Sequence, residues 1–96
     1  MEDLRRRFLP RFVRTGRERA QRAREACGTR LDLVAAELHA LAGEAALLGL
    51  GDIDQLAREG ERAARKKISE DCVETLAKIE AALATMSDAD ADLERD

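Results

Sequence analysis

The sequence predicts an all-α protein that folds as an antiparallel four-helix bundle with an additional short helical segment at its N-terminus. Ala, Leu, Arg and Glu dominate a chain of 96 residues that contains two phenylalanines, one proline and no other aromatic residue. These residue types favour helices and leave little from which to build strands. Apolar positions recur at steps of three and four along four segments, which is the period of a helix face. The length allows one modest core and no second domain.

The first predicted helix covers residues 3–27, where apolar or small residues recur on one face. Pro10 lies near its start, and a proline interrupts the hydrogen-bond ladder of a helix. We therefore expect a kink or a restart there, with a short helical segment before it. Gly28 offers the stop signal that ends the helix.

The second predicted helix begins near Arg30 and carries the most regular apolar stripe of the chain. Thr29 and Asp32 have the spacing of a capping box at its start. Gly49-Leu50-Gly51 ends it, and we expect this helix to be the central one. The stripe consists of Leu31, Val34, Leu38, Leu41, Ala45 and Leu48.

Two further helices are expected, one from Ile53 to about Arg65 and one from Ser69 to Met86. Asp52, with Gln55 three residues later, is the predicted N-cap of the third helix. Residues 66–69 form the predicted turn before the last helix. Residues 1–87 are thus expected to form the bundle, and residues 88–96 a disordered acidic tail.

The single histidine, His39, is predicted on the outer face of the second helix. At about 100° per residue, it falls roughly 130° from the mean direction of the apolar stripe. A glycine inside a helix costs about 1 kcal/mol relative to alanine, so Gly43 on this face indicates close approach by another molecule. An exposed imidazole is partly neutral at cellular pH and can attack a phosphorus centre. The residues around it at helical spacing are small: Ala35, Ala36, Gly43 and Ala46.

Several other classes of protein have little support in this sequence. Cys27 and Cys72 are far apart and the chain has one histidine, so neither a zinc site nor a disulfide is expected. No apolar run is long enough to span a membrane or to resemble a signal peptide, which favours the cytoplasm and no membrane partner. Residues 1–30 hold ten arginines against four acidic residues but show no recognition-helix pattern. We interpret them as a solvated helix face and do not expect nucleic acid as a partner.

The segment from His39 to Gly49, with Ile53 and Leu56 after it, resembles the signature of the histidine-phosphotransfer (Hpt) domain family. That signature reads His, any residue, Leu, Lys, Gly, a small residue, and then an apolar residue and Gly. The resemblance covers roughly residues 4–86 and implies an all-helical phosphate carrier. By this resemblance His39 is the phosphoacceptor, through Nε2, and Gly43 is the glycine at which a receiver domain approaches. Leu41, Leu48 and Gly49 match structural positions.

Two positions depart from the signature, since Ala42 stands where the family has lysine and Glu44 where it has a small residue. The lysine is expected to place positive charge near the phosphoryl oxygens, so its loss weakens electrostatic stabilisation of phosphohistidine. Arginines of the next helix are candidates to replace that charge, namely Arg58, Arg62 and Arg65.

The resemblance implies a phosphocarrier of a two-component phosphorelay rather than a stand-alone enzyme. His39 would exchange a phosphoryl group with receiver aspartates, and the partners would be a response-regulator receiver, a histidine kinase or both. No cofactor is expected on this chain, which we take to be a monomer, and Mg²⁺ belongs to the receiver. The alternative is a pseudo-Hpt adaptor or inhibitor that binds a kinase or receiver without transfer. The residues expected to contact the partner are Ala35, Ala36, Ala42, Gly43, Ala46, Leu47 and Leu50.

Overall fold

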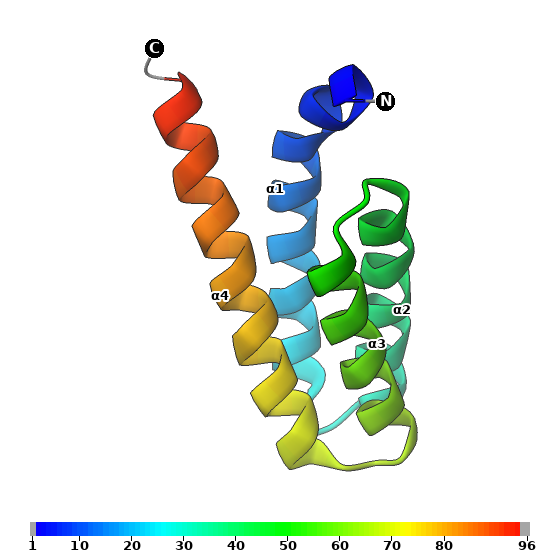
Figure 1. Cartoon of the computed structure of the whole chain (residues 1–96). Helices are drawn as coiled ribbons and strands as arrows, with labels where there is room; N and C mark the ends of the chain where they lie inside the picture. The colour runs from blue at the N-terminus through cyan, green and yellow to red at the C-terminus, as the bar shows by residue number, and fades with distance from the viewer. Residues whose placement is uncertain (1, 95–96) are drawn as a thin grey trace.

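The computed structural model describes the backbone of residues 2–94 and the side chains of residues 6–86. Four helices follow one another along the chain and are shown in Figure 1: α1 (Glu2–Ala26), α2 (Leu31–Leu47), α3 (Gly51–Arg65) and α4 (Ser69–Glu94). The described backbone contains no strand. The predicted all-α class with four helices is therefore confirmed.

The helices alternate in direction, because short turns connect each one to the next (Figure 1). Helix α1 packs against α2 and α4, and α3 packs against the same two helices. The α2–α3 pair has the most extensive contact of the four. The face of α2 that carries His39 is therefore positioned mainly by α3.

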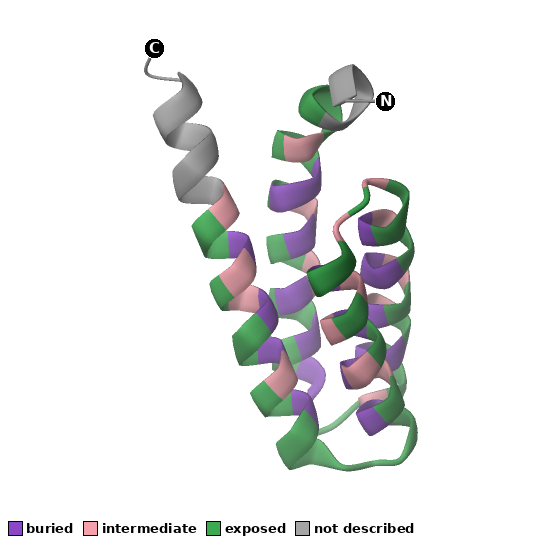
Figure 2. Cartoon of the chain, in the orientation of Figure 1, coloured by how far each residue is buried: buried purple, intermediate pink, exposed green. Residues whose placement is uncertain are grey.

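The core follows the predicted apolar stripes, as the buried strips along all four helices show in Figure 2. On α2, Val34, Leu38, Leu41 and Ala45 are buried, while Leu31 and Leu48 pack at the edge of the core. Helix α4 contributes Leu76, Ile79 and Leu83, which are fully buried. Burying a side chain of this size stabilises a fold by about 1.5–3 kcal/mol, so these contacts hold the four helices together.

The predicted side-chain caps of α2 and α3 are wrong. The N-cap of α2 is Arg30, which makes no capping hydrogen bond, and Arg30 instead binds the Asp32 carboxylate with both Nε and Nη2. The hydrogen bond from Arg30 holds the pKa of Asp32 below its ordinary value. The N-cap of α3 is Leu50, which places Asp52 inside the first turn of the helix.

The two predicted turns around α3 are confirmed. After α2, Gly49 adopts a φ of 72°, a left-handed conformation that costs glycine little. The amide of Leu50 then donates to the carbonyl of Ala45 at 2.9 Å and closes the turn. After α3, Lys67 has a φ of 62° between Arg65 and Ser69.

The two ends of the chain differ from the predicted boundaries. Helix α1 is continuous from Glu2 to Ala26 with Pro10 inside it, so a separate N-terminal segment is not shown. Figure 1 shows that its first turns bend away from the axis of the rest of the helix. Helix α4 continues to Glu94, past the boundary predicted at residue 87. The side chains of residues 87–96 lie outside the described residues, so the predicted acidic tail stays a prediction.

Candidate functional site

His39 lies in the middle of α2 on the outer face of the bundle, as predicted. Its side chain is 74% exposed, because the core stripe of α2 points in another direction. Exposure of this kind leaves the imidazole open to a molecule in solution.

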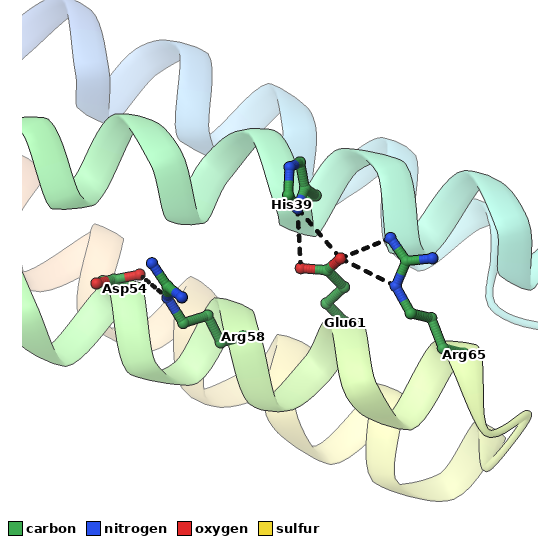
Figure 3. Close-up of polar contacts among 5 residues, drawn as sticks. All are labelled: His39, Asp54, Arg58, Glu61 and Arg65. Carbon is green, nitrogen blue, oxygen red and sulfur yellow. Dashed lines mark hydrogen bonds and ion pairs between the residues drawn. The ribbon is translucent and has the colours of Figure 1, made fainter.

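The carboxylate of Glu61 on α3 contacts the imidazole from the neighbouring helix, as Figure 3 shows. His39 Nδ1 lies 3.2 Å from both Glu61 Oε1 and Glu61 Oε2. An ionised carboxylate only accepts hydrogen bonds, so Nδ1 carries the hydrogen and donates it. In the neutral ring this leaves Nε2 with a free lone pair, which makes Nε2 the nucleophilic atom.

Arg65 holds Glu61 in place. Its Nε and Nη2 both donate to Glu61 Oε2, at 3.0 and 2.7 Å. Partial burial acts to raise the pKa of Glu61, but the hydrogen bonds from Arg65 and His39 outweigh it, and the pKa lies below its ordinary value. Glu61 is thus ionised at neutral pH and fixes the ring tautomer of His39.

Sequence reasoning missed Glu61. The spacing of Glu61 and Arg65 does indicate an ion pair within one helix. It does not indicate which residue of α2 lies opposite, because that depends on how the two helices pack. The signal that could have suggested it is the position of Glu61 on α3, beside the buried stripe that faces α2.

The predicted partner-contacting residues divide into two groups. Ala36, Gly43, Ala46 and Leu47 are exposed, and Leu50 is half-buried. A Cβ placed on Gly43 would meet no atom within 4 Å, so nothing in the described fold requires glycine there. Ala35 and Ala42 are 6% and 4% exposed, so the prediction that they belong to the open face is wrong.

Their burial follows from the packing of α2 against α3. Ala35 and Ala42 lie between His39 and the core stripe, on the flank of α2 that faces α3. Small residues there let the two helices approach closely. The approach of the two helices is closest to a steric limit at Gly60 of α3, where an added Cβ would lie 2.6 Å from Leu38 Cδ1. We call this contact between α2 and α3 the α2–α3 seam.

Glu44, the other departure from the signature, is held on the opposite flank of α2. Arg19 of α1 binds its Oε1 with Nε at 2.9 Å and with Nη2 at 2.7 Å. This ion pair offsets the negative charge of Glu44. The negative charge of Glu44 is therefore compensated within the bundle.

An apolar hollow lies beside this flank, between α1 and the C-terminal end of α2. It is lined by four apolar and four polar or charged residues: Phe8, Phe12, Leu47 and Leu48, and Arg11, Thr15, Arg19 and Glu44. Leu47 is 88% exposed, which is unusual for a large apolar side chain. The contribution of α1 to this surface was not predicted from the sequence.

The arrangement around His39 can be compared with known families. A model of the Hpt domain family matches residues 7–89. The chain belongs to the Hpt domain family. The resemblance seen in the sequence is thus confirmed. Membership in this family supports a histidine phosphotransfer role in phosphorelays.

Hpt domains are phosphocarriers rather than enzymes, and they interact with histidine kinases and response-regulator receivers. No curated protein and no solved structure matches this chain. Among the described residues, no helix combines the length and the apolar character needed to cross a membrane. Its two cysteines are buried and free.

Proposed function

We propose that this Hpt domain accepts a phosphoryl group on Nε2 of His39 and exchanges it with the aspartate of response-regulator receivers. The observation that carries the proposal is the hydrogen bond from Nδ1 to Glu61, which in the neutral form of this exposed ring leaves the lone pair of Nε2 free to attack. The receiver supplies the aspartate and Mg²⁺, and this chain supplies the nucleophile. The proposal takes the chain to act in the cytoplasm as a monomer, as expected from the sequence.

The transfer step balances without a further catalytic group on this chain. The Nε2 lone pair attacks phosphorus, the N–P bond forms, and the bond between phosphorus and the aspartyl oxygen breaks to release the carboxylate. Nδ1 keeps its hydrogen, so the ring gains a positive charge. The carboxylate of Glu61, 3.2 Å from Nδ1, stabilises that charge.

The open face of α2 suits a transient partner. The exposed residues around His39 on this face are small, namely Ala36, Gly43 and Ala46. The surface of a partner can therefore lie close to the backbone of α2. Leu47 and Phe8 add apolar area at the edge of this face. An apolar centre with a polar rim is typical of protein–protein interfaces.

The decisive experiment compares the wild-type protein with His39→Gln. Each is incubated with a panel of receivers phosphorylated by acetyl phosphate, and acid-labile, base-stable phosphate on the Hpt domain is followed. We expect label on the wild type and none on His39→Gln. Label on both proteins would exclude His39 as the acceptor.

The buried Ala42 favours a second candidate function, because the chain lacks the signature lysine and the residue in its place does not reach the open face. In this case the domain is an adaptor or inhibitor that binds a receiver or kinase without transfer. Stable binding of a receiver to the wild type and to His39→Gln, with no label on either, would support it.

A further inference from the structure

Cys27 and Cys72 are the two cysteines of the chain, and the fold brings them to the same end of the bundle. Cys27 directly follows α1, and Cys72 lies in the first turn of α4. Helices α1 and α4 pack against each other. Figure 1 shows the end of α1 and the start of α4 at the end of the bundle opposite the two termini. Two positions that are far apart along the chain therefore belong to one end of one helix pair.

The register of α1 and α4 sets the heights of the two cysteines. A Cβ added to Gly16 of α1 would lie 3.4 Å from both Cδ atoms of Leu83 of α4, so these two residues face each other. Cys27 lies eleven residues after Gly16, and Cys72 lies eleven residues before Leu83. Eleven residues make about three complete turns of an α-helix, and the two helices run antiparallel. Cys27 and Cys72 are therefore on the facing sides of their helices and at the same height.

The layers between these two levels are closed. The residues of both helices there are buried, namely Ala20 and Ala23 of α1 and Leu76 and Ile79 of α4. Small residues on α1 let α4 approach closely. Arg24 Nη2 binds Glu80 Oε1 at 2.6 Å across the same pair of helices. Cys27 and Cys72 are themselves buried in the core cluster, so both thiols lie inside this interface.

The two thiols also lie within electrostatic reach of each other. Burial raises the pKa of Cys72, and a negative charge on Cys27 raises it further. Burial also raises the pKa of Cys27, although the charge of Arg24 acts to lower it. Cys72 Sγ is a weak donor to the carbonyl oxygen of Gly60 at 3.9 Å. Both thiols are thus protonated at neutral pH, so they react slowly and only a small oxidant suits them.

We propose that Cys27 and Cys72 form a thiol pair that a peroxide oxidises to a disulfide between α1 and α4. Cys27 attacks first, because it is 6% exposed at the end of its helix while Cys72 is fully buried. Its thiolate takes one oxygen of the peroxide, the O–O bond breaks, and a sulfenic acid and one water form. The Cys72 thiolate turns from Gly60 and attacks that sulfur, the S–S bond forms, and the S–O bond breaks to release a second water. The two thiols lose two electrons, which reduce the peroxide.

The reduced pair is the resting form in a reducing compartment such as the cytoplasm, where disulfides are rare and serve redox responses. The disulfide would close a loop over residues 27–72, which includes α2 and α3. A closed loop constrains the unfolded chain and stabilises the folded one. The thiol pair is independent of phosphoryl transfer by His39.

The test treats the full-length protein with hydrogen peroxide at about pH 8, where more of each thiol is ionised. Mass spectrometry, titration of free thiols and thermal unfolding follow the product. The matched control is the double variant Ala26→Cys/Cys27→Ala, which keeps the composition and turns the thiol by about 100° around α1. Cys72→Ala is the control with a single thiol. Circular dichroism checks that both variants are folded.

We expect the wild type to lose about 2 Da, the mass of two hydrogens, together with both free thiols. Its melting temperature should rise by at least about 10 °C, because closing a loop of this length strongly stabilises a small domain. A dithiol reductant should reverse both changes. The double variant and Cys72→Ala should show neither the loss of mass nor the rise in melting temperature.

Three results would overturn the proposal. The wild type could keep both thiols, or gain oxygen on each sulfur without the loss of mass. The double variant could form a disulfide as fast as the wild type, in which case pairing occurs in the opened chain and not through the register of α1 and α4. Disulfide-linked dimers could form in place of the oxidised monomer. Each of these results would leave the role of His39 unchanged.

Discussion

Helix α2 has two neighbouring faces built from the same kinds of residue and used in different ways. In the α2–α3 seam, Ala35 and Ala42 are buried, and Gly60 of the facing helix lies against the core. On the open face, Ala36 and Gly43 are exposed and touch no other helix closely. The comparison teaches that small residues near a histidine serve packing on one side and access on the other.

The two flanks of His39 also differ in chemistry. Toward α3, Glu61 and Arg65 form a charged network that reaches the imidazole. Toward α1, the surface beyond Glu44 becomes apolar at Leu47 and Phe8. His39 therefore lies at the border between a polar region that controls its chemistry and an apolar region that suits docking.

The largest effect is expected from Ala42→Lys, which restores the signature lysine at a buried position. The charged group must leave the α2–α3 seam to reach water, or be buried without a partner. We expect the free energy of unfolding to fall by about 3 kcal/mol. Ala46→Lys, on the open face, should change it by less than about 0.5 kcal/mol. Urea denaturation measures both, and an unchanged stability of Ala42→Lys would place residue 42 on the open face.

Leu47→Asp tests the apolar side of the open face. A charge in the apolar edge of the docking surface should slow phosphoryl transfer from a receiver at least about tenfold. Labelling by phosphoramidate should stay the same, because that reaction needs no partner. Leu33→Asp is the matched control, since Leu33 is an exposed leucine at the other end of the same helix. Equal transfer rates for the two variants would show that the partner binds elsewhere.

Gly60→Ala tests the seam with a single methyl group. That carbon would lie 2.6 Å from Leu38 Cδ1 and 3.3 Å from Thr75 Cγ2, and Leu38 is buried on all sides. Overpacking of this kind costs more than alanine gains in helix propensity, so we expect a loss of about 1 kcal/mol. Thermal unfolding followed by circular dichroism measures it. A rise in melting temperature would mean that the seam has room to spare.

Gly43→Ala is the counterpart on the open face, with an expected effect of opposite sign. Nothing lies within 4 Å of the added carbon, and alanine is the better helix former. We expect stability to rise by about 0.5–1 kcal/mol. Transfer from a receiver should become slower if the glycine serves close approach of the partner. A variant that is both more stable and equally fast would remove the functional reason for Gly43.

Much of this fold could be predicted from the sequence. The period of the apolar residues predicted the four helices and the outward direction of His39, and the structure confirms both. This succeeded because the side of a helix on which a residue lies depends only on local geometry. Ala35 and Ala42 were misplaced, since residues at the edge of a stripe are buried or open depending on how closely the next helix packs. Glu61 was missed for the same reason. The predicted cap of α2 is wrong at a position where Arg30 binds Asp32, and that of α3 because the helix begins before Asp52.

The smallest effect concerns acid stability and tests whether Glu61 belongs to the polar flank. Its pKa is lower in the folded protein than the ordinary value of 4.5, so its contacts stabilise the fold above that pH. This contribution is lost as the pH falls through the folded-state pKa. Glu61→Gln should therefore be less stable than the wild type at pH 7, and the difference should shrink as the pH falls below 4.5. Urea midpoints measured from pH 7 to pH 3 check this. A difference that stays constant over that range would mean that Glu61 contributes through its shape alone, and the charged network beside His39 would lose its electrostatic role.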